Sequence, residues 1–122
     1  MKSEIKNLYS PDIQETLDLY KPKKNDNFGL LLEIDIGIEN EEGADIFNIV
    51  LCTPKWFEEF YKKKDMVLGL HHIFVFEYNY EKLYKKLKEL MCIEGKDWHE
   101  IATKLSYIGH WEFQDYKEWG EW

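Results

Sequence analysis

The sequence predicts an α+β fold, with a mainly antiparallel sheet of about four strands and helices packed on one face. Apolar residues alternate with other residues over 28–38 and again over 47–51, on either side of a Gly-containing turn at 40–44,. Two later segments, 80–91 and 98–108, repeat apolar residues at helical spacing,. The predicted order of elements is β-β-β-α-β-α-α. A chain of 122 residues is expected to build one core, so residues 1–122 are predicted to form a single domain,.

The hairpin is predicted to be the centre of the fold. Every even position in 28–38 is apolar, whereas the odd positions include Glu33 and Asp35. Period two of this kind places one face of a strand in the core and leaves the other face mostly in solvent. A first strand is expected at residues 3–9, followed by an irregular segment up to the hairpin.

Three helices are predicted from their start signals. Thr53 followed by Pro54 combines an N-cap hydroxyl with the first helical position, which favours proline, and predicts a helix over 54–63,. Its lysines at 62–64 suit the negative end of the helix dipole. Asn79 is expected to cap the second helix, and Asp97 a third helix that ends at Gly109,.

A fourth strand is predicted within residues 70–78. This stretch is apolar on both faces, which is typical of an inner strand that is covered twice,. Residues 110–122 are expected to form an aromatic, acidic tail.

The negative charge is concentrated in one part of the chain. The formal net charge is −8, and residues 25–54 carry seven carboxylates with no Lys or Arg. A local field of this sign favours a basic partner and argues against nucleic acid, whose phosphates would be repelled. The chain has no apolar run long enough for a membrane span,. Its N-terminus lacks the apolar stretch of a signal peptide, which favours a cytoplasmic location.

Few residues point to catalysis. His71 and His72 are expected on opposite faces of a strand, and Cys52 and Cys92 are interpreted as two free, buried thiols,. No phosphate-binding, nucleophile-elbow or zinc motif occurs, so no enzyme activity, metal or cofactor is predicted,. The alternative is a ligand-binding or enzymatic domain with a pocket near Glu33 and Asp35, because two like charges on one face raise a carboxyl pKa.

The partner surface is predicted from charge and aromatic placement. One hypothesis uses the hairpin tip, and another uses the tail, although Trp111 could simply pin that tail to the sheet. The candidate partner-binding residues are Glu33, Asp35, Glu39, Glu41, Glu42, Asp45, Trp111, Glu112, Asp115, Trp119 and Trp122. The protein could be a monomer, or a homodimer through the Leu31, Val50 and Cys52 side of the hairpin.

Four stretches together carry a family resemblance. They are EIKNLYSPD (4–12), DNFGLLLEIDIG (26–37), CTPKWF (52–57) and KLSYIGHWEFQDY (104–116). In this order the set resembles the immunity protein 8 family of bacterial polymorphic-toxin systems. The resemblance implies a cytoplasmic protein, encoded beside a toxin, that binds the toxin domain and blocks it without catalysis. A nuclease toxin would be basic, in agreement with the acidic hairpin.

Overall fold

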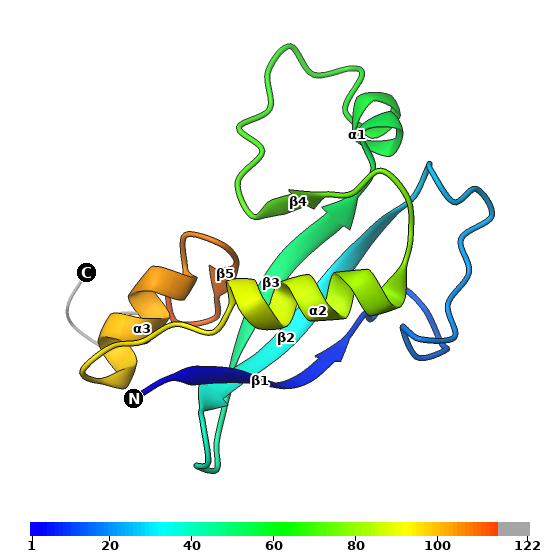
Figure 1. Cartoon of the computed structure of the whole chain (residues 1–122). Coiled ribbons are helices and arrows are strands. Elements are labelled where there is room, and N and C mark those ends of the chain that lie inside the picture. The colour runs from blue at the N-terminus through cyan, green and yellow to red at the C-terminus, as the bar shows by residue number, and fades with distance from the viewer. Residues whose placement is uncertain (115–122) are drawn as a thin grey trace.

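A computed structural model describes residues 1–114 of the chain and confirms an α+β fold with a mostly antiparallel sheet (Figure 1). The strands are β1 Ser3–Tyr9, β2 Gly29–Ile38, β3 Asp45–Cys52, β4 His72–Phe74 and β5 His110–Trp111. The helices are α1 Pro54–Phe60, α2 Tyr80–Leu90 and α3 Trp98–Leu105. In the described part of the chain, no helix is both long and apolar enough to span a membrane.

The sheet has the strand order β1-β2-β3-β4, and β5 also pairs with β3. β1, β2 and β3 are antiparallel neighbours, whereas β4 runs parallel to β3. The outer edge of β3 is shared between two short strands. β4 pairs with residues 50–52 of β3, and β5 pairs antiparallel with Phe47 and Asn48.

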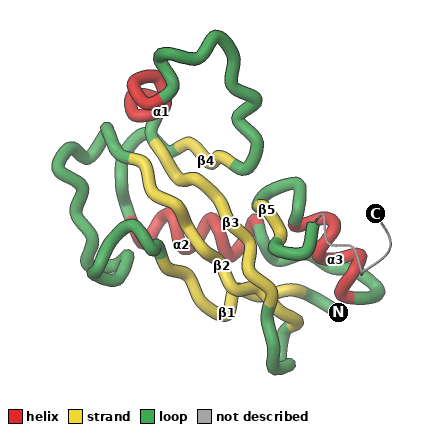
Figure 2. The backbone as a smooth tube through the Cα atoms, turned by 180° about the vertical axis from the view of Figure 1, so that it is seen from behind, coloured by secondary structure: helices red, strands yellow, loops and turns green. Residues whose placement is uncertain are grey.

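The core lies between the sheet and two helices. Of the nine inward-facing hairpin side chains expected from the alternation, all but Ile38 are buried. They pack with Leu83 and Leu87 of α2 and with Ile101 and Leu105 of α3. α2 crosses one face of the sheet (Figure 1), and from behind no helix lies over β1, β2 and β3 (Figure 2). We call this second face, which carries Glu33 and Asp35, the open face.

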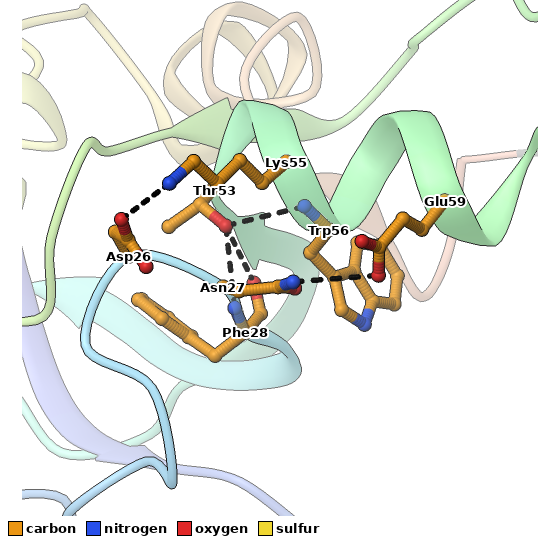
Figure 3. Close-up of polar contacts among 7 residues, drawn as sticks. All are labelled: Asp26, Asn27, Phe28, Thr53, Lys55, Trp56 and Glu59. Carbon is orange, nitrogen blue, oxygen red and sulfur yellow. Dashed lines mark hydrogen bonds and ion pairs between the residues drawn. The ribbon is translucent and has the colours of Figure 1, made fainter.

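Thr53 makes the predicted junction between β3 and α1 (Figure 3). Its buried hydroxyl accepts the backbone N–H of Trp56 over 3.4 Å, as an N-cap does, and that of Phe28 over 3.2 Å,. The Thr53 backbone N–H donates to the carbonyl of Phe28 over 3.0 Å. α1 is therefore tied to the start of β2, and the Trp56 ring lies where a side chain at Gly29 would stand.

The caps at Asn79 and Asp97 are confirmed, but two predicted helix ends are wrong. α1 ends at Phe60 rather than at residue 63, and α3 ends at Leu105. Tyr61 leaves the helical conformation, since its ring packs on Phe57 and its hydroxyl lies 3.0 Å from Nε2 of His72. The lysines at 62–64 consequently lie beyond the helix, so its last turn contains no basic residue to interact with the negative end of the dipole.

The prediction of an inner strand at 70–78 is also wrong. β4 is three residues long and, among the described residues, has β3 as its one neighbour. Phe74 is 47% exposed and Phe76 is 80% exposed, so this run is not covered on both sides. The sheet edge next to Phe47 is instead covered by β5, a strand that the sequence does not predict.

Candidate functional site: an acidic hairpin

The tip of the β2–β3 hairpin presents three exposed carboxylates, Glu39, Glu41 and Glu42. The turn is made by Asn40 and Gly43, whose φ angles of 66° and 96° lie in the left-handed region that Asn and Gly tolerate,. The tip projects beyond the strands that support it (Figure 1). Within residues 1–114, none of the three tip carboxylates takes part in an ion pair of 4.0 Å or less.

Lys6 supports the tip from β1. Its Nζ lies 2.6 Å from Oε1 of Glu4 and donates to the carbonyl of Glu41 over 2.8 Å. The ammonium lowers the pKa of the Glu4 carboxyl, chiefly through this hydrogen bond. Lys6 thus neutralises Glu4 and holds the main chain of the tip, while the side chain of Glu41 stays available to a partner.

Glu33 and Asp35 extend the acidic surface onto the open face. Glu33 pairs with Tyr9 on β1 and with Asn48 on β3, so the three side chains form a row across the sheet. The Tyr9 hydroxyl donates to Oε2 of Glu33, which raises the pKa of Tyr9 to about 12 because the hydrogen bond and the nearby carboxylate both disfavour a phenolate,. Oδ1 of Asn48 is buried without a hydrogen-bond partner in the described structure.

Asp45 lies in an internal contact rather than at the tip. Its Oδ2 accepts the indole N–H of Trp98 over 2.7 Å and that of Trp111 over 2.9 Å. The Trp111 ring also stacks on Phe47, with the ring centroids 6.4 Å apart. Trp111 therefore anchors β5 to the sheet, which was the alternative weighed for it.

Glu112 likewise supports the sheet edge. Its Oε1 accepts the backbone N–H of Ile46 over 2.9 Å, and its own N–H donates to the carbonyl of Ile46 over 3.0 Å. Three further candidates, Asp115, Trp119 and Trp122, lie outside the described residues. The structure thus brings Glu33, Asp35 and the tip carboxylates together along one hairpin, whereas Asp45, Trp111 and Glu112 make contacts within the fold.

The two cysteines differ in exposure. Cys52 is fully buried, which raises the pKa of its thiol to about 11,. Cys92 is exposed, so the prediction of two buried thiols is wrong for this residue. It follows Met91 at the end of α2, where the chain turns away from the core. Because Cys52 is buried, it is also not part of an exposed dimer face with Leu31 and Val50, which are half-buried.

The described residues contain no group of three or more His, Cys, Asp or Glu side chains that could hold a metal ion. His71 and His110 are in ring contact, with centroids 5.7 Å apart, and Nε2 of His71 lies 2.8 Å from the carbonyl of Ser106. The main cavities on the described surface include three with volumes of about 520, 190 and 310 Å³, and neither Glu33 nor Asp35 lines these three. The alternative pocket near these two carboxylates therefore has no counterpart among these cavities.

Six large apolar side chains in and before the β4 segment are exposed, although the sequence does not predict their exposure. They belong to α1, to the loop after it and to the β4 segment, and all are at least 47% exposed: Phe60, Met66, Leu68, Leu70, Phe74 and Phe76. An apolar run has the same sequence signature in a core strand and in an interface, so composition alone assigned it to the core.

The family model described as immunity protein 8 (Imm8) matches residues 3–116, nearly the whole chain. No curated protein and no solved structure matches the chain.

Proposed function

The chain belongs to the immunity protein 8 family, and we propose that it neutralises a basic toxin domain, such as a nuclease, by covering that domain with the acidic hairpin. Membership of this family makes the chain an immunity protein of a toxin–immunity system, with a toxin as partner. The proposal adds the sign of the partner's charge, the surface that meets it and a mechanism without catalysis. It places the complex in the cytoplasm of the protected cell.

The observation that carries the proposal is the distribution of charge on the hairpin. Residues 25–54 hold seven carboxylates and no cation, out of a net charge of −8 for the chain. The tip carboxylates are exposed and unpaired within the described structure, and Glu33 and Asp35 continue the negative surface along β2. A toxin that acts on a phosphate-bearing substrate needs a positive surface, to which this hairpin is complementary.

Blocking by this surface requires no chemical step. The acidic hairpin competes with the substrate's phosphates for the same positive region of the toxin, and opposite charges accelerate the encounter of the two proteins. The strands of the hairpin hold this surface in place, because their other face is buried in the core from Leu30 to Leu51. Little conformational freedom of the main chain is therefore lost when the toxin binds.

The test of the surface is a double charge reversal at the tip, Glu41→Lys with Glu42→Lys, measured against the toxin domain encoded by the neighbouring gene. We expect association in low salt to slow by about tenfold or more, with a weaker dependence on ionic strength. The matched control, Glu58→Lys with Glu81→Lys, changes the net charge equally at exposed sites on α1 and α2. An equal loss in both variants would assign the effect to net charge and rule out the tip.

The test of the function is rescue of growth. Cells that express the toxin domain should survive when the wild-type chain is co-expressed, and survival should require binding in a pull-down assay. Failure of the folded wild-type protein to rescue would overturn the proposed immunity against that toxin. Rescue that persists in the tip variant would keep the function and move the inhibitory contact elsewhere.

A further inference from the structure

α2 and the segment that contains β4 lie far from the hairpin tip (Figure 1). Residues of both line one groove, which is a second surface of interest. The cavity has a volume of about 520 Å³ and reaches the core at Leu51, Leu83 and Leu87. Phe76 and Leu90 also line it and are 80% and 47% exposed. Exposed apolar side chains along an apolar cavity are typical of a site that receives an anchor side chain from another protein.

The strand on one wall of the groove has an unused hydrogen-bonding edge. The carbonyl of His71 accepts from Val50, and the N–H of Val75 donates to the carbonyl of Cys52, so the odd-numbered residues of this segment bond to β3. In a parallel ladder the intervening residues direct their N–H and C=O groups to the opposite side. For His72 and Phe74 that side carries no further strand in the described part of the sheet.

The helix on the other wall contributes positive charge. Lys82, Lys86 and Leu90 follow one another at intervals of four residues, so they form a line of about 12 Å along α2 beside the cavity,. Lys82 has no ion pair within residues 1–114, and Lys86 meets Glu89 only at 3.9 Å with both side chains exposed. Glu77 is the one acidic residue that lines the groove.

From these three observations we propose that the groove binds an extended acidic segment of a partner protein, which adds to the free edge of β4 as a further strand. Alternate side chains of such a segment point to the same side of the sheet, so an apolar residue enters the cavity while carboxylates two residues away from it, on the same side, meet Lys82 and Lys86,. About four extended residues cover the 12 Å line on α2.

A peptide of defined sequence tests the proposal without any toxin. The probe is a fluorescein-labelled octapeptide in which glutamate and leucine alternate at every second position with serine between them, so that both point to one side, and its control has lysine in place of glutamate. Because the whole protein carries a formal net charge of −8, its overall electrostatic field favours binding of the lysine peptide,. We expect tighter binding of the glutamate peptide by fluorescence anisotropy, which only a local positive site can produce.

Charge reversals on α2 locate the site. Lys82→Glu with Lys86→Glu should weaken binding of the glutamate peptide by about tenfold or more, since two attractions become repulsions. Lys85→Glu with Lys88→Glu makes the same change of net charge at two exposed positions outside the groove and should have a much smaller effect. Equal losses in the two variants would overturn the assignment to the groove.

Hydrogen exchange tests the strand addition itself. Binding of the glutamate peptide should slow exchange of the backbone amides of His72 and Phe74, while the exposed amides of the hairpin tip are unaffected. Unchanged exchange at both residues under saturating peptide, or preference for the lysine peptide, would overturn the proposal. Since neither measurement uses the toxin or the hairpin tip, the result is independent of the function proposed above.

Discussion

Trp111 donates its indole N–H to Oδ2 of Asp45 over 2.9 Å, so a side-chain bond joins β5 to the first residue of β3. Trp98 of α3 donates to the same oxygen over 2.7 Å. One carboxylate thus connects the hairpin, the third helix and the last described strand. The position of Asp45 next to the acidic turn suggested a partner contact, but its oxygen is engaged by two part-buried donors.

Replacement of Asp45 tests this connection. Asp45→Ala leaves two indole N–H groups without their charged acceptor and is expected to lower the free energy of unfolding by about 1–3 kcal/mol. Asp45→Asn keeps a neutral acceptor and should cost less. Urea unfolding followed by tryptophan fluorescence gives both values, with the exposed Glu42→Ala as control. An Asp45→Ala protein as stable as the control would show that the two bonds contribute nothing.

The contact between Gly29 and Trp56 predicts a steric effect. A Cβ at position 29 would overlap the Trp56 ring, so Gly29→Ala should destabilise the protein by about 1–3 kcal/mol,. In a Trp56→Ala background the ring is absent, and the same change at Gly29 should then be nearly neutral. The double-mutant cycle measures this coupling by chemical unfolding. If the losses of unfolding free energy from the two substitutions were additive, the contact between Gly29 and Trp56 would be contradicted.

The two thiols should react at very different rates. Cys92 is exposed, whereas burial keeps Cys52 inaccessible and raises the pKa of its thiol to about 11, so it is protonated near pH 8,. Ellman's reagent should label one thiol quickly in the native protein and the second only after unfolding. Cys92→Ser should abolish the fast phase, and Cys52→Ser should retain it. Two fast thiols in the wild-type protein would contradict the burial of Cys52.

Tyr9 should titrate at unusually high pH. Its hydrogen bond to Glu33 raises the pKa from 10.0 to about 12, so folding favours the protonated phenol. The resulting stabilisation is complete below pH 10 and is lost as the pH rises from 10 to about 12,. The difference in tyrosinate absorbance between wild type and Tyr9→Phe isolates this group. Glu33→Gln should move the Tyr9 pKa back toward 10, and an unchanged midpoint would exclude Glu33 as its cause.

The parts of the fold that local chemistry determines were predictable from the sequence. The alternation from Phe28 to Ile38 identified the core face of β2, and the caps Thr53, Asn79 and Asp97 identified three helix starts. Each of these signals depends on neighbours within a few residues. The tip carboxylates were predictable as exposed for the same reason, because a charged turn cannot enter a core.

The remaining features depend on contacts between distant segments. β5 is two residues long and pairs with a strand more than sixty positions earlier, so it leaves no periodic pattern. The role of Asp45 depends on hydrogen bonds from Trp98 and Trp111 to one of its carboxylate oxygens. No spacing in the sequence indicates this contact. Phe74 and Phe76 are exposed, although the sequence predicts that they are buried, because an interface and a core use the same kinds of apolar side chain.

The division of the outer edge of β3 between β4 and β5 has a consequence during synthesis. Translation completes β1, β2 and β3 long before His110 and Trp111 leave the ribosome, since residues 53–109 separate them from β3. Until then the edge at Phe47 and Asn48 is an open template for pairing with other nascent chains,. Pairing with β5 therefore covers this part of the β3 edge only after residues 53–109 have been translated, and shorter nascent chains keep it open.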